Sequence, residues 1–564
     1  MHRFEFDASD LEQVAAWLGS QPDYAPFTFR DLGSQTLHET YLDTEDWSLY
    51  RARFSLSIQG TSVEAEVKLR QLGSEKNGLR EEREWTQPLP EYSLGAGEDS
   101  VAQRVKLLTD DKPLQTLFVT EVQRQTHEVR SSAGALGVIN LDVVSLTKHG
   151  ECLRTLSHVS VVAAQSEARK ALEPFVEGIG EACGLIPARS SLFAVGLEAA
   201  GLEPRAHFDF GYVGLLPDSA TGEYAYALMR RYFGDFLISE PGTRLGEDPE
   251  ALHDMRVATR KSRAAISIFK DALSPRFVAL REELKWLGQA LGEVRDLDVQ
   301  SIWLTGERDS SGWQQSVALG PLIEELATSR AAARARLLAD MHSPRYAELI
   351  DGMKKALIQA DYATESSAEP VRRCAARILR KRFSQFEAIA SELQPDSAST
   401  AYHAARISGK RLRYALESFY PILEDNPRAV RVVNSAKRVQ DLLGEYQDCV
   451  TAIARLEAMA QTAALPTATV FLMGQLVERL RKRMEDIREA WPSSYENLHR
   501  NWQRVSRLLK NKLDLQQAPD DADEVDADAP PVAVQRPFWL LRRFVGHSRI
   551  RPDETDSGRH GAGQ

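Results

Sequence analysis

The chain has 564 residues, of which 43% are hydrophobic and 27% charged, and its net charge is −11. This length exceeds what one core supports and predicts about two to four domains. No apolar run approaches the roughly 20 residues that span a bilayer, and the N-terminus has no apolar signal region, so we expect a cytoplasmic protein without a transmembrane segment. The four cysteines lack CxxC spacing, which argues against a zinc site or a disulfide framework.

The charge is distributed unevenly along the chain. Residues 224–514 contain 44 Lys and Arg against 38 Asp and Glu, whereas residues 1–223 contain 20 against 34 and residues 515–564 contain 6 against 9. Only the middle region is therefore net positive. A polyanionic partner is compatible with that region even though the whole chain is acidic.

Residues 1–200 predict an antiparallel α+β domain. A short helical pattern runs from Leu11 to Leu18, with Ser9 as the expected N-cap. A second helix is expected over Ser166–Cys183, ending at Gly184. Alternating apolar and polar residues predict strands, and glycines mark the turns between them. The expected strands are Phe54–Ile58, Val63–Leu69, Phe118–Val122, Val138–Val144 and Val159–Val162.

The chain then passes through a Gly/Pro-rich linker, residues 201–222, into a region that reads as almost entirely helical. We expect this region, residues 223–513, to form two four-helix bundles, 223–360 and 367–513. Prolines and glycines are expected to end the helices, among them Pro241-Gly242 and Pro344. The predicted helices are 223–238, 250–273, 276–303, 315–342, 367–394, 398–420, 427–460, 467–490 and 493–513.

The tail, residues 514–564, begins with the acidic segment PDDADEVDADAP and is expected to be disordered. The segment PFWLLRRFVG, from Pro537, is short, aromatic and basic. We interpret it first as a tail that folds back on the domain; the alternative is a docking segment for a protein partner or an interfacial helix.

Two stretches of the helical region share one pattern of cations. HDMRVATRKSR begins at His253, and HAARISGKRLR begins at His403 with basic residues at the same offsets. At about 100° per residue, the basic residues form a narrow stripe on one helix face, flanked by Lys261 in the first copy. We name these sets the first stripe and the second stripe; they comprise His253, Arg256, Arg260, Lys261 and Arg263, and His403, Arg406, Lys410, Arg411 and Arg413.

A row of cations on one helix face suits an extended anion with regularly spaced charges. Ten residues of helix rise about 15 Å, so one stripe spans several phosphates. Arginine offers forked donors to phosphate oxygens, and histidine gains charge as the pH falls. The alternative is a salt-bridged interface between helices, which would be favoured if there were only one copy. We expect no specific nucleic-acid partner, because no groove-reading motif and no interleaved aromatic residues are present.

Acidic segments follow each stripe. LGEVRDLDV begins at Leu291 and LGEYQDCV at Leu443. We expect their carboxylates to support the histidine or the arginines from behind. Metal binding is the alternative, but carboxylates two residues apart on a helix converge poorly. The acids concerned are Glu293, Asp296, Asp298, Glu445 and Asp448.

The duplicated stripes and the two LGE segments resemble the CHAD family over residues 212–513. The resemblance implies two four-helix bundles around a basic cavity that binds inorganic polyphosphate, and an association with polyphosphate granules. The stripes match position by position, except that Lys410 and Arg411 stand where the first copy has Arg260 and Lys261.

Residues 1–200 resemble the CYTH family of triphosphate tunnel enzymes. The matching stretches are YLDTEDWSLY from Tyr41, VKLRQLG from Val67, GLREEREW from Gly78 and LFVTEVQRQT from Leu117. This resemblance implies an eight-stranded antiparallel barrel, in which inward carboxylates hold Mg²⁺ or Mn²⁺ and basic residues hold the phosphates. The basic residues in question are Lys68, Arg70, Arg80, Arg83 and Arg124. Their alternative role is ordinary salt bridging with nearby glutamates.

The chain departs from the CYTH pattern at the acidic strands. Arg3 and Glu5 stand where the family's opening Glu-x-Glu-x-Lys strand is expected, SLSIQ follows the YLDT stretch in place of Leu-Arg-x-Arg, and LSHVSVV, from Leu156, carries no carboxylate. Without these acids a metal has few ligands, and hydrolysis loses its Lewis acid. We therefore name no catalytic residues, metal ligands or required cofactor.

The leading hypothesis is a polyphosphate-binding protein with an inactive barrel that serves as a scaffold or regulatory partner. The alternative is a metal-dependent triphosphatase or polyphosphatase, with Mg²⁺ or Mn²⁺ as cofactor, to which the helical region presents substrate. A third reading is a module that docks acidic proteins. The enzyme would require other acids in the barrel, and the candidates are Glu64, Glu66, Glu82, Glu84, Glu121 and Asp142.

Overall fold

The structure is a computed structural model that describes residues 2–510 except 21–22, 25, 61–63, 74, 77–78, 82, 90, 92–99, 133, 166–167, 205–208, 311, 362–363, 424–425 and 463–464. The acidic tail and the segment from Pro537 lie outside the described residues. None of the helices within the described ranges is both apolar enough and long enough to cross a bilayer. The chain divides into two compact units, residues 1–291 with 343–369, and residues 292–342 with the part from 370 onward.

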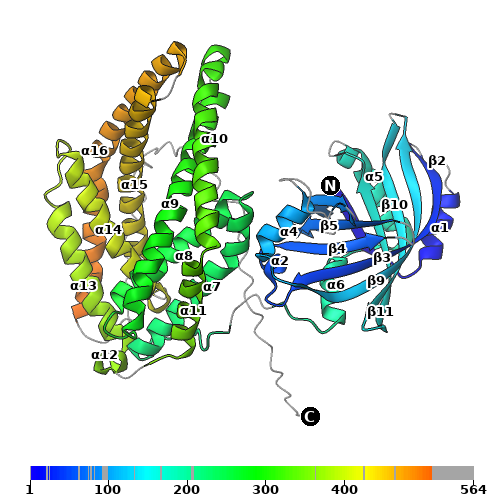
Figure 1. The fold of residues 1–564 in the computed structure, drawn as a ribbon, viewed down its shortest axis with the longest axis horizontal. Coiled ribbons are helices and arrows are strands. Elements are labelled where there is room, and N and C mark those ends of the chain that lie inside the picture. The colour runs from blue at the N-terminus through cyan, green and yellow to red at the C-terminus, as the bar shows by residue number, and fades with distance from the viewer. Residues whose placement is uncertain are drawn as a thin grey trace, which may run out of the picture. The chain divides into compact units, whose positions relative to one another are not determined.

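The first unit opens with the antiparallel sheet that the sequence predicts (Figure 1). Its strands follow the path β6-β7-β1-β11-β10-β9-β3-β4-β5-β8. Strands β7 and β8 are consecutive, and they pair with β1 and β5 at opposite ends of this path, so the sheet curls on itself as a barrel. The strands are β1 (His2–Asp7), β2 (Asp23–Tyr24), β3 (Phe27–Thr44), β4 (Phe54–Gly60), β5 (Ala65–Gln71), β6 (Glu75–Lys76), β7 (Leu79–Glu81), β8 (Glu84–Pro88), β9 (Leu114–Ser131), β10 (Gly134–Lys148), β11 (Glu151–Ala163) and β12 (Ile186–Pro187).

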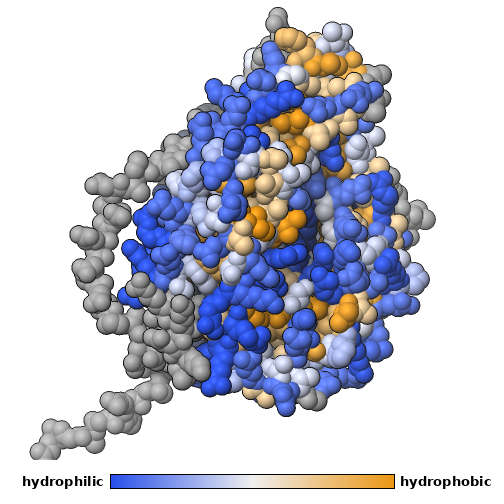
Figure 2. Space-filling view, turned by 90° about the vertical axis from the view of Figure 1, so that its left-hand side faces the viewer, coloured by the Kyte–Doolittle hydropathy of each residue, from blue (hydrophilic) through white to orange (hydrophobic). Residues whose placement is uncertain are grey.

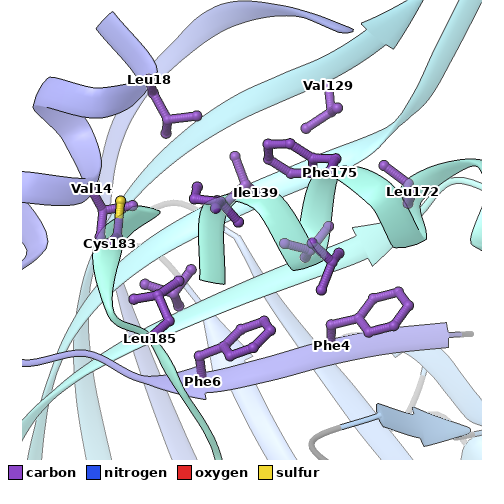
Figure 3. Close-up of a cluster of buried hydrophobic side chains, with 14 of the residues drawn as sticks. Phe4, Phe6, Val14, Leu18, Val129, Ile139, Leu172, Phe175, Cys183 and Leu185 are labelled. Atoms are coloured by element: carbon purple, nitrogen blue, oxygen red, sulfur yellow. The ribbon is translucent and has the colours of Figure 1, made fainter. Parts of the chain in front are cut away.

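Helices α1 (Leu11–Ser20) and α5 (Ala168–Cys183) cover part of the outside of this sheet. Phe4 and Phe6 of β1 pack with Phe175 of α5 in one buried cluster (Figure 3). Such a phenylalanine contributes about 1.5–3 kcal/mol by burial. The N-cap of α1 is Asp10, whose carboxylate accepts from the N–H groups of Glu12 and Gln13. Our prediction of Ser9 was wrong by one residue, because the longer Asp side chain reaches both donors.

A second cluster covers β4 and β5 from outside, where α2 (Ser48–Arg51) and α4 (Val101–Thr109) lie. On the inside, α6 (Leu192–Ala199) packs Phe193 against Tyr41 and Phe118, whose rings stack 4.7 Å apart. A Cβ at Gly196 would approach the Phe118 ring to 2.2 Å, so only glycine lets α6 come this close. An apolar cluster thus fills part of the barrel interior.

The remainder of the described chain is helical, as predicted. Several helices are longer than the pattern suggested, and α15 alone spans 36 residues. The helices are α7 (Thr221–Leu245), α8 (Pro249–Ile268), α9 (Arg276–Asp309), α10 (Trp313–Met341), α11 (Pro344–Ile358), α12 (Glu365–Ala368), α13 (Val371–Ala390), α14 (Ser399–Phe419), α15 (Pro427–Thr462) and α16 (Thr467–Lys510), with a 3₁₀ turn over Tyr420–Ile422.

Two of the expected helix breaks, after residue 238 and between residues 490 and 493, do not occur. Pro241 lies within α7 and Pro492 within α16. Trp491, 1% exposed, packs against Tyr402 and Tyr495, and this burial keeps α16 continuous across the expected break. Pro344 follows the end of α10 at Met341, as we expected. It also begins α11, a helix that we did not predict, because Ser343 caps it and proline suits the first helical position.

In the second unit, α13 to α16 form a four-helix bundle. Each helix packs against the next in the chain, and α13 also contacts α16. Phe383 stacks on Trp502 with ring centroids 4.2 Å apart, which links the first and last of these helices. Figure 2 looks onto the side where α13, α14 and α16 lie in Figure 1, and its surface is largely hydrophilic.

Candidate functional site: the two basic stripes

The stripes lie on α8 and α14, and these helices bury equivalent positions. Seven residues of α8 are buried, and each has a buried counterpart 150 positions later in α14. The half-buried cations fall at equivalent positions between them. The buried sets are Leu252, Met255, Ala258, Thr259, Ser262, Ala265 and Ile266, and Tyr402, Ala405, Ser408, Gly409, Leu412, Ala415 and Leu416.

The first stripe belongs to the first unit. Asp248 accepts from the N–H of Glu250 and caps α8, and Pro249 occupies the first turn. His253, Arg256, Arg260 and Arg263 are each half-buried. Arg263 lies near α9, where it is one of the cations that, after Lys285, lower the pKa of the exposed Glu282.

The second stripe belongs to the second unit and lies beside α15. His403 Nδ1 is 2.6 Å from Oε1 of Gln447. Asp448 lies close to Arg406 and Lys410: burial raises the pKa of its carboxyl, while the two cations oppose that rise. An acid of the LGEYQDCV segment therefore stands beside these two cations; its supporting role stays a prediction. Arg413 pairs with Glu417 one turn along its own helix, at 2.6 Å.

The flanking cations at offset eight face the preceding helix in both copies. Lys261 lies 5.5 Å from the ring centroid of Tyr232 on α7. Arg411 is exposed and close enough to Arg382 of α13 to contribute, after burial, to lowering the pKa of that guanidinium. Tyr232 and Arg382 are also 150 residues apart, so they occupy equivalent positions. The flanking cation therefore lies near an aromatic ring in the first copy and near a second cation in the second copy.

The remaining acids of the LGE segments make other ion pairs. Asp298, 3% exposed, pairs with Arg330 of α10, and Glu293 pairs with Arg336. Glu445 accepts two hydrogen bonds from Arg483 of α16, at 2.6 and 3.0 Å. Asp296 contributes to raising the pKa of Asp448, which places these two acids near each other in the second unit.

Two side chains near the second stripe were not among the site residues predicted from the sequence. Arg488 of α16 lies over the rings of Tyr402 and Tyr446, 5.7 and 5.5 Å from their centroids, and donates to the Tyr446 hydroxyl at 2.8 Å. Gln447, the partner of His403, was the other. The aromatic residue directly before His403 was the available signal, because stacked tyrosines attract a guanidinium.

The barrel interior contains cations paired with acids. Arg70 donates to Glu39 at 2.7 Å and to Glu84 at 2.5 Å. Arg124 makes two hydrogen bonds to Asp142. Burial alone would raise the pKa of Glu39. Arg70 and the Ser57 hydroxyl instead hold this pKa at about 2.

The other barrel candidates differ in position. Burial lowers the pKa of Lys68, and the nearby charge of Arg70 lowers it further. The Lys68 ammonium donates a hydrogen bond to the side chain of Gln59. Arg83 is exposed, and the side chain of Arg80 lies outside the described residues. Of the acids that an enzyme would require, Glu84 and Asp142 lie inside in ion pairs, Glu64, Glu66 and Glu121 are exposed, and Glu82 lies outside the described residues.

The part of the chain that the structure describes contains no group of three or more His, Cys, Asp or Glu side chains arranged to hold a metal ion. Glu5, 3% exposed, lies 3.6 Å from Arg3, and burial lowers the pKa of His158 on the neighbouring strand. The interior acids of the barrel are thus placed to balance its interior cations.

Comparison with known proteins finds relatives that match parts of the chain. An uncharacterized protein of Mycobacterium tuberculosis is 29% identical over 251 residues, 42% of this chain, and the chain spans about half of that relative's length (47%). The CHAD domain of the plant Ricinus communis covers 51% of this chain and 96% of its own, with 24% identity and a TM-score of 0.40. PptA from Streptomyces chartreusis covers 50% and 100%, with 21% identity and a TM-score of 0.39.

The barrel region has its own similar structure. A protein from Hippeastrum, described as a putative adenylyl cyclase with a dominant triphosphatase activity, covers 36% of this chain and 96% of its own, with 17% identity and a TM-score of 0.27. For the helical region, the model of the CHAD domain matches residues 227–457, which include both stripes. The chain therefore contains a CHAD domain.

Proposed function

We propose that the protein binds inorganic polyphosphate along the two basic stripes. The observation that carries this proposal is the equivalence of α8 and α14: the same positions are buried at a constant offset of 150, and the same positions between them carry cations. A linear polyanion presents the same charge at regular intervals, so it can use two equivalent cationic helices in the same way.

The partial neutralisation of the stripes also supports this role. Asp448 beside Arg406 and Lys410, and Glu417 beside Arg413, moderate the repulsion among the cations without removing their net charge. Three cations of the first stripe and their counterparts in the second are half-buried, so their charges are screened less than those of freely exposed side chains. They are Arg256, Arg260 and Arg263, and Arg406, Lys410 and Arg413. Association with polyphosphate granules would follow from such binding and belongs to the same proposal.

A metal-dependent triphosphatase is the second candidate, favoured by the interior position of Lys68, Arg70 and Arg124. The ion pairs Arg70–Glu39 and Arg124–Asp142 weigh against it, because phosphate and metal would each have to displace an existing partner. The residues described offer no ready set of metal ligands. We therefore place binding in the helical region first.

The test measures binding and hydrolysis in one preparation of the full chain. The variant Arg256→Ala/Arg260→Ala/Arg406→Ala/Arg413→Ala is expected to lose polyphosphate binding. A matched control, Arg130→Ala/Arg154→Ala/Arg345→Ala/Arg500→Ala, removes four exposed arginines outside the stripes and should keep it. Equal loss in both variants would reduce the effect to net charge and overturn the proposal. Phosphate release from tripolyphosphate with Mg²⁺ or Mn²⁺, abolished by Asp142→Asn, would favour the enzyme.

A further inference from the structure

The corner between α7 and α8, just before the first stripe, is held by the barrel. α7 ends at Leu245, Gly246 follows with a φ of 70°, and α8 begins at Pro249. These elements and the barrel belong to one compact unit. His253, the first residue of the stripe, lies nine positions after Arg244, which is in the last turn of α7.

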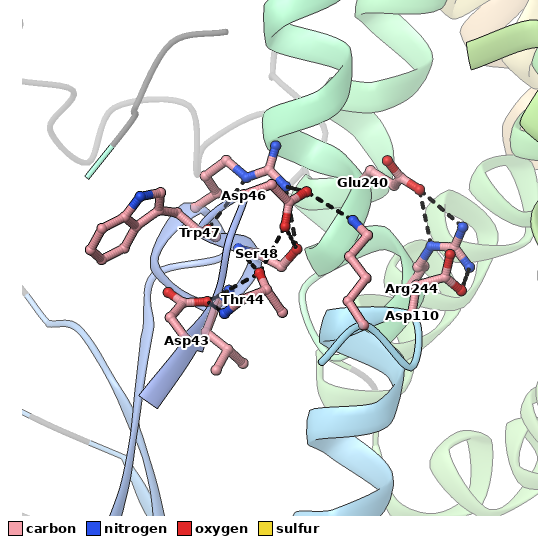
Figure 4. A network of polar contacts seen from close by, with 11 residues as sticks. Asp43, Thr44, Asp46, Trp47, Ser48, Asp110, Glu240 and Arg244 are labelled. Atoms are coloured by element: carbon pink, nitrogen blue, oxygen red, sulfur yellow. Dashed lines mark hydrogen bonds and ion pairs between the residues drawn. The ribbon is translucent and has the colours of Figure 1, made fainter. Parts of the chain in front are cut away.

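Arg244 is the central contact at this corner. It is 2% exposed, and its guanidinium pairs with Glu240 of α7 at 3.0 Å and with Asp110 of the barrel at 2.8 Å (Figure 4). A buried arginine between two carboxylates is fixed in orientation, because each charged donor requires an acceptor. The corner is therefore tied to the barrel by a side chain that has little freedom.

The barrel side of this contact is rigid. Asp110 is the C-cap residue of α4, with a left-handed φ of 55°, and its N–H donates to the carbonyl of Lys106. Lys112 follows it and pairs with Asp46 at 2.8 Å, which in turn pairs with Arg51 of α2. Figure 4 shows both sets of contacts, those of Asp46 beside the α2 turn and those of Arg244 with Asp110 and Glu240.

Two further contacts grip the same corner. Leu245 is buried in the cluster that includes Leu49 of α2 and Val105 of α4. Arg104 of α4 pairs with Glu247, in the turn itself, at 2.7 Å. Polar and apolar contacts thus hold three of the four residues that directly precede Asp248, the N-cap of α8.

We propose that Arg244 is a positioning residue through which the barrel fixes the start of α8 and so sets the affinity of the first stripe for polyphosphate. The inference rests on the proposed function. It gives the barrel a role in binding that requires neither a ligand nor chemistry inside it. Breaking the contact frees the corner, and a stripe that must be ordered on binding has a lower affinity.

The test compares Arg244→Met with Arg230→Met in the full chain. Arg230 is a matched control: it lies on α7, is 7% exposed, and donates to the carbonyls of Leu357 and Tyr212 rather than to the barrel. Binding of inorganic polyphosphate and hydrogen exchange over residues 249–256 are measured alongside the melting temperature. Arg244→Met should raise Kd about 2- to 30-fold and speed exchange in this segment. Arg230→Met should do neither at a similar loss of melting temperature.

A wild-type Kd for Arg244→Met, or equal weakening by Arg230→Met, would overturn the inference. If Arg244→Met does not fold, Glu247→Gln breaks one partly exposed contact at the same corner and should give a smaller change in the same direction. Failure of the wild-type chain to bind polyphosphate would instead refute the proposed function. In that case faster exchange specific to Arg244→Met would still support its hold on α8, and unchanged exchange would refute that as well.

Discussion

Arg124 of β9 and Asp142 of β10 form a bidentate ion pair inside the barrel. The Nε to Oδ1 and Nη2 to Oδ2 distances are both 2.7 Å, and the carboxylate is 1% exposed. The two residues face each other across neighbouring strands, so the sheet itself sets their geometry. Both carboxylate oxygens are engaged with the guanidinium, which makes Asp142 a structural counter-ion for Arg124.

The first prediction concerns this pair. Arg124→Met leaves a buried carboxylate without its counter-ion and should destabilise the barrel by about 3–5 kcal/mol. Arg124→Met/Asp142→Asn should recover much of that loss, because the buried charge is removed with its partner. Chemical denaturation measures both. The control is Arg130→Met on the same strand, where an exposed pair with Glu128 contributes only about 0–1 kcal/mol. A loss in Arg124→Met no larger than in this control would contradict the assignment.

The second prediction is a pH dependence from Glu39. Its pKa is lowered from 4.5 to about 2 by Arg70 and Ser57, against the effect of burial. A lowered pKa in the folded state stabilises the fold above pH 4.5, and this contribution is lost as the pH falls through about 2. The difference in unfolding free energy between the wild type and Glu39→Gln should therefore be largest at neutral pH and shrink below pH 4.5. A constant difference from pH 7 to pH 3 would contradict it.

The duplication was predictable from the sequence because the basic residues recur at the same spacing in both copies. A stripe that repeats at fixed offsets implies equivalent helices, and the burial of α8 and α14 agrees with that position by position. The strands were predictable from alternation for the same reason: one face of each strand packs against helices such as α5. The lengths of the five predicted strands were underestimated, since alternation weakens where both faces of a strand are covered. Other strands, such as β3 and β8, were not predicted.

The partners of charged residues were not predictable. Asp298 and Asp448 stand in equivalent segments but two positions apart in their alignment, and one pairs with Arg330 while the other lies beside Arg406. Which cation reaches an acid depends on the rotation of each helix about its own axis. The spacing of residues in the sequence does not define that rotation closely enough. The hold of Arg244 on Asp110 was hidden for a related reason, because 134 residues separate them.

The third prediction concerns a helix contact in which the two halves of the helical region place the larger side chain on opposite helices. Thr259 of α8 packs against Gly288 of α9, where an added Cβ would lie 3.4 Å from the Thr259 methyl. In the second half Gly409 of α14 faces Gln440 of α15. Gly288→Gln should overpack its contact and destabilise the chain by about 1–3 kcal/mol, whereas Thr259→Gly/Gly288→Gln should be less destabilised than the sum of its single variants. Strict additivity in the double-mutant cycle would contradict this exchange.

The fourth prediction is the salt dependence of polyphosphate binding. Cations that contact phosphates release counterions, so the logarithm of the binding constant should fall linearly with the logarithm of salt concentration. Arg256→Ala and Arg406→Ala should each weaken binding and reduce the magnitude of this slope by about 1, and the double variant by about 2. Titration with polyphosphate of one chain length at several salt concentrations gives the slopes.

The control for this prediction is Arg154→Ala/Arg500→Ala, which changes the net charge by the same amount away from the stripes. Its slope should equal that of the wild type, because arginines that do not touch the polyanion release no counterions from it. Weaker binding by Arg256→Ala/Arg406→Ala with an unchanged slope would mean that these arginines shape the helices and do not contact phosphate. The slope therefore separates direct contact along α8 and α14 from a structural effect of the same substitutions.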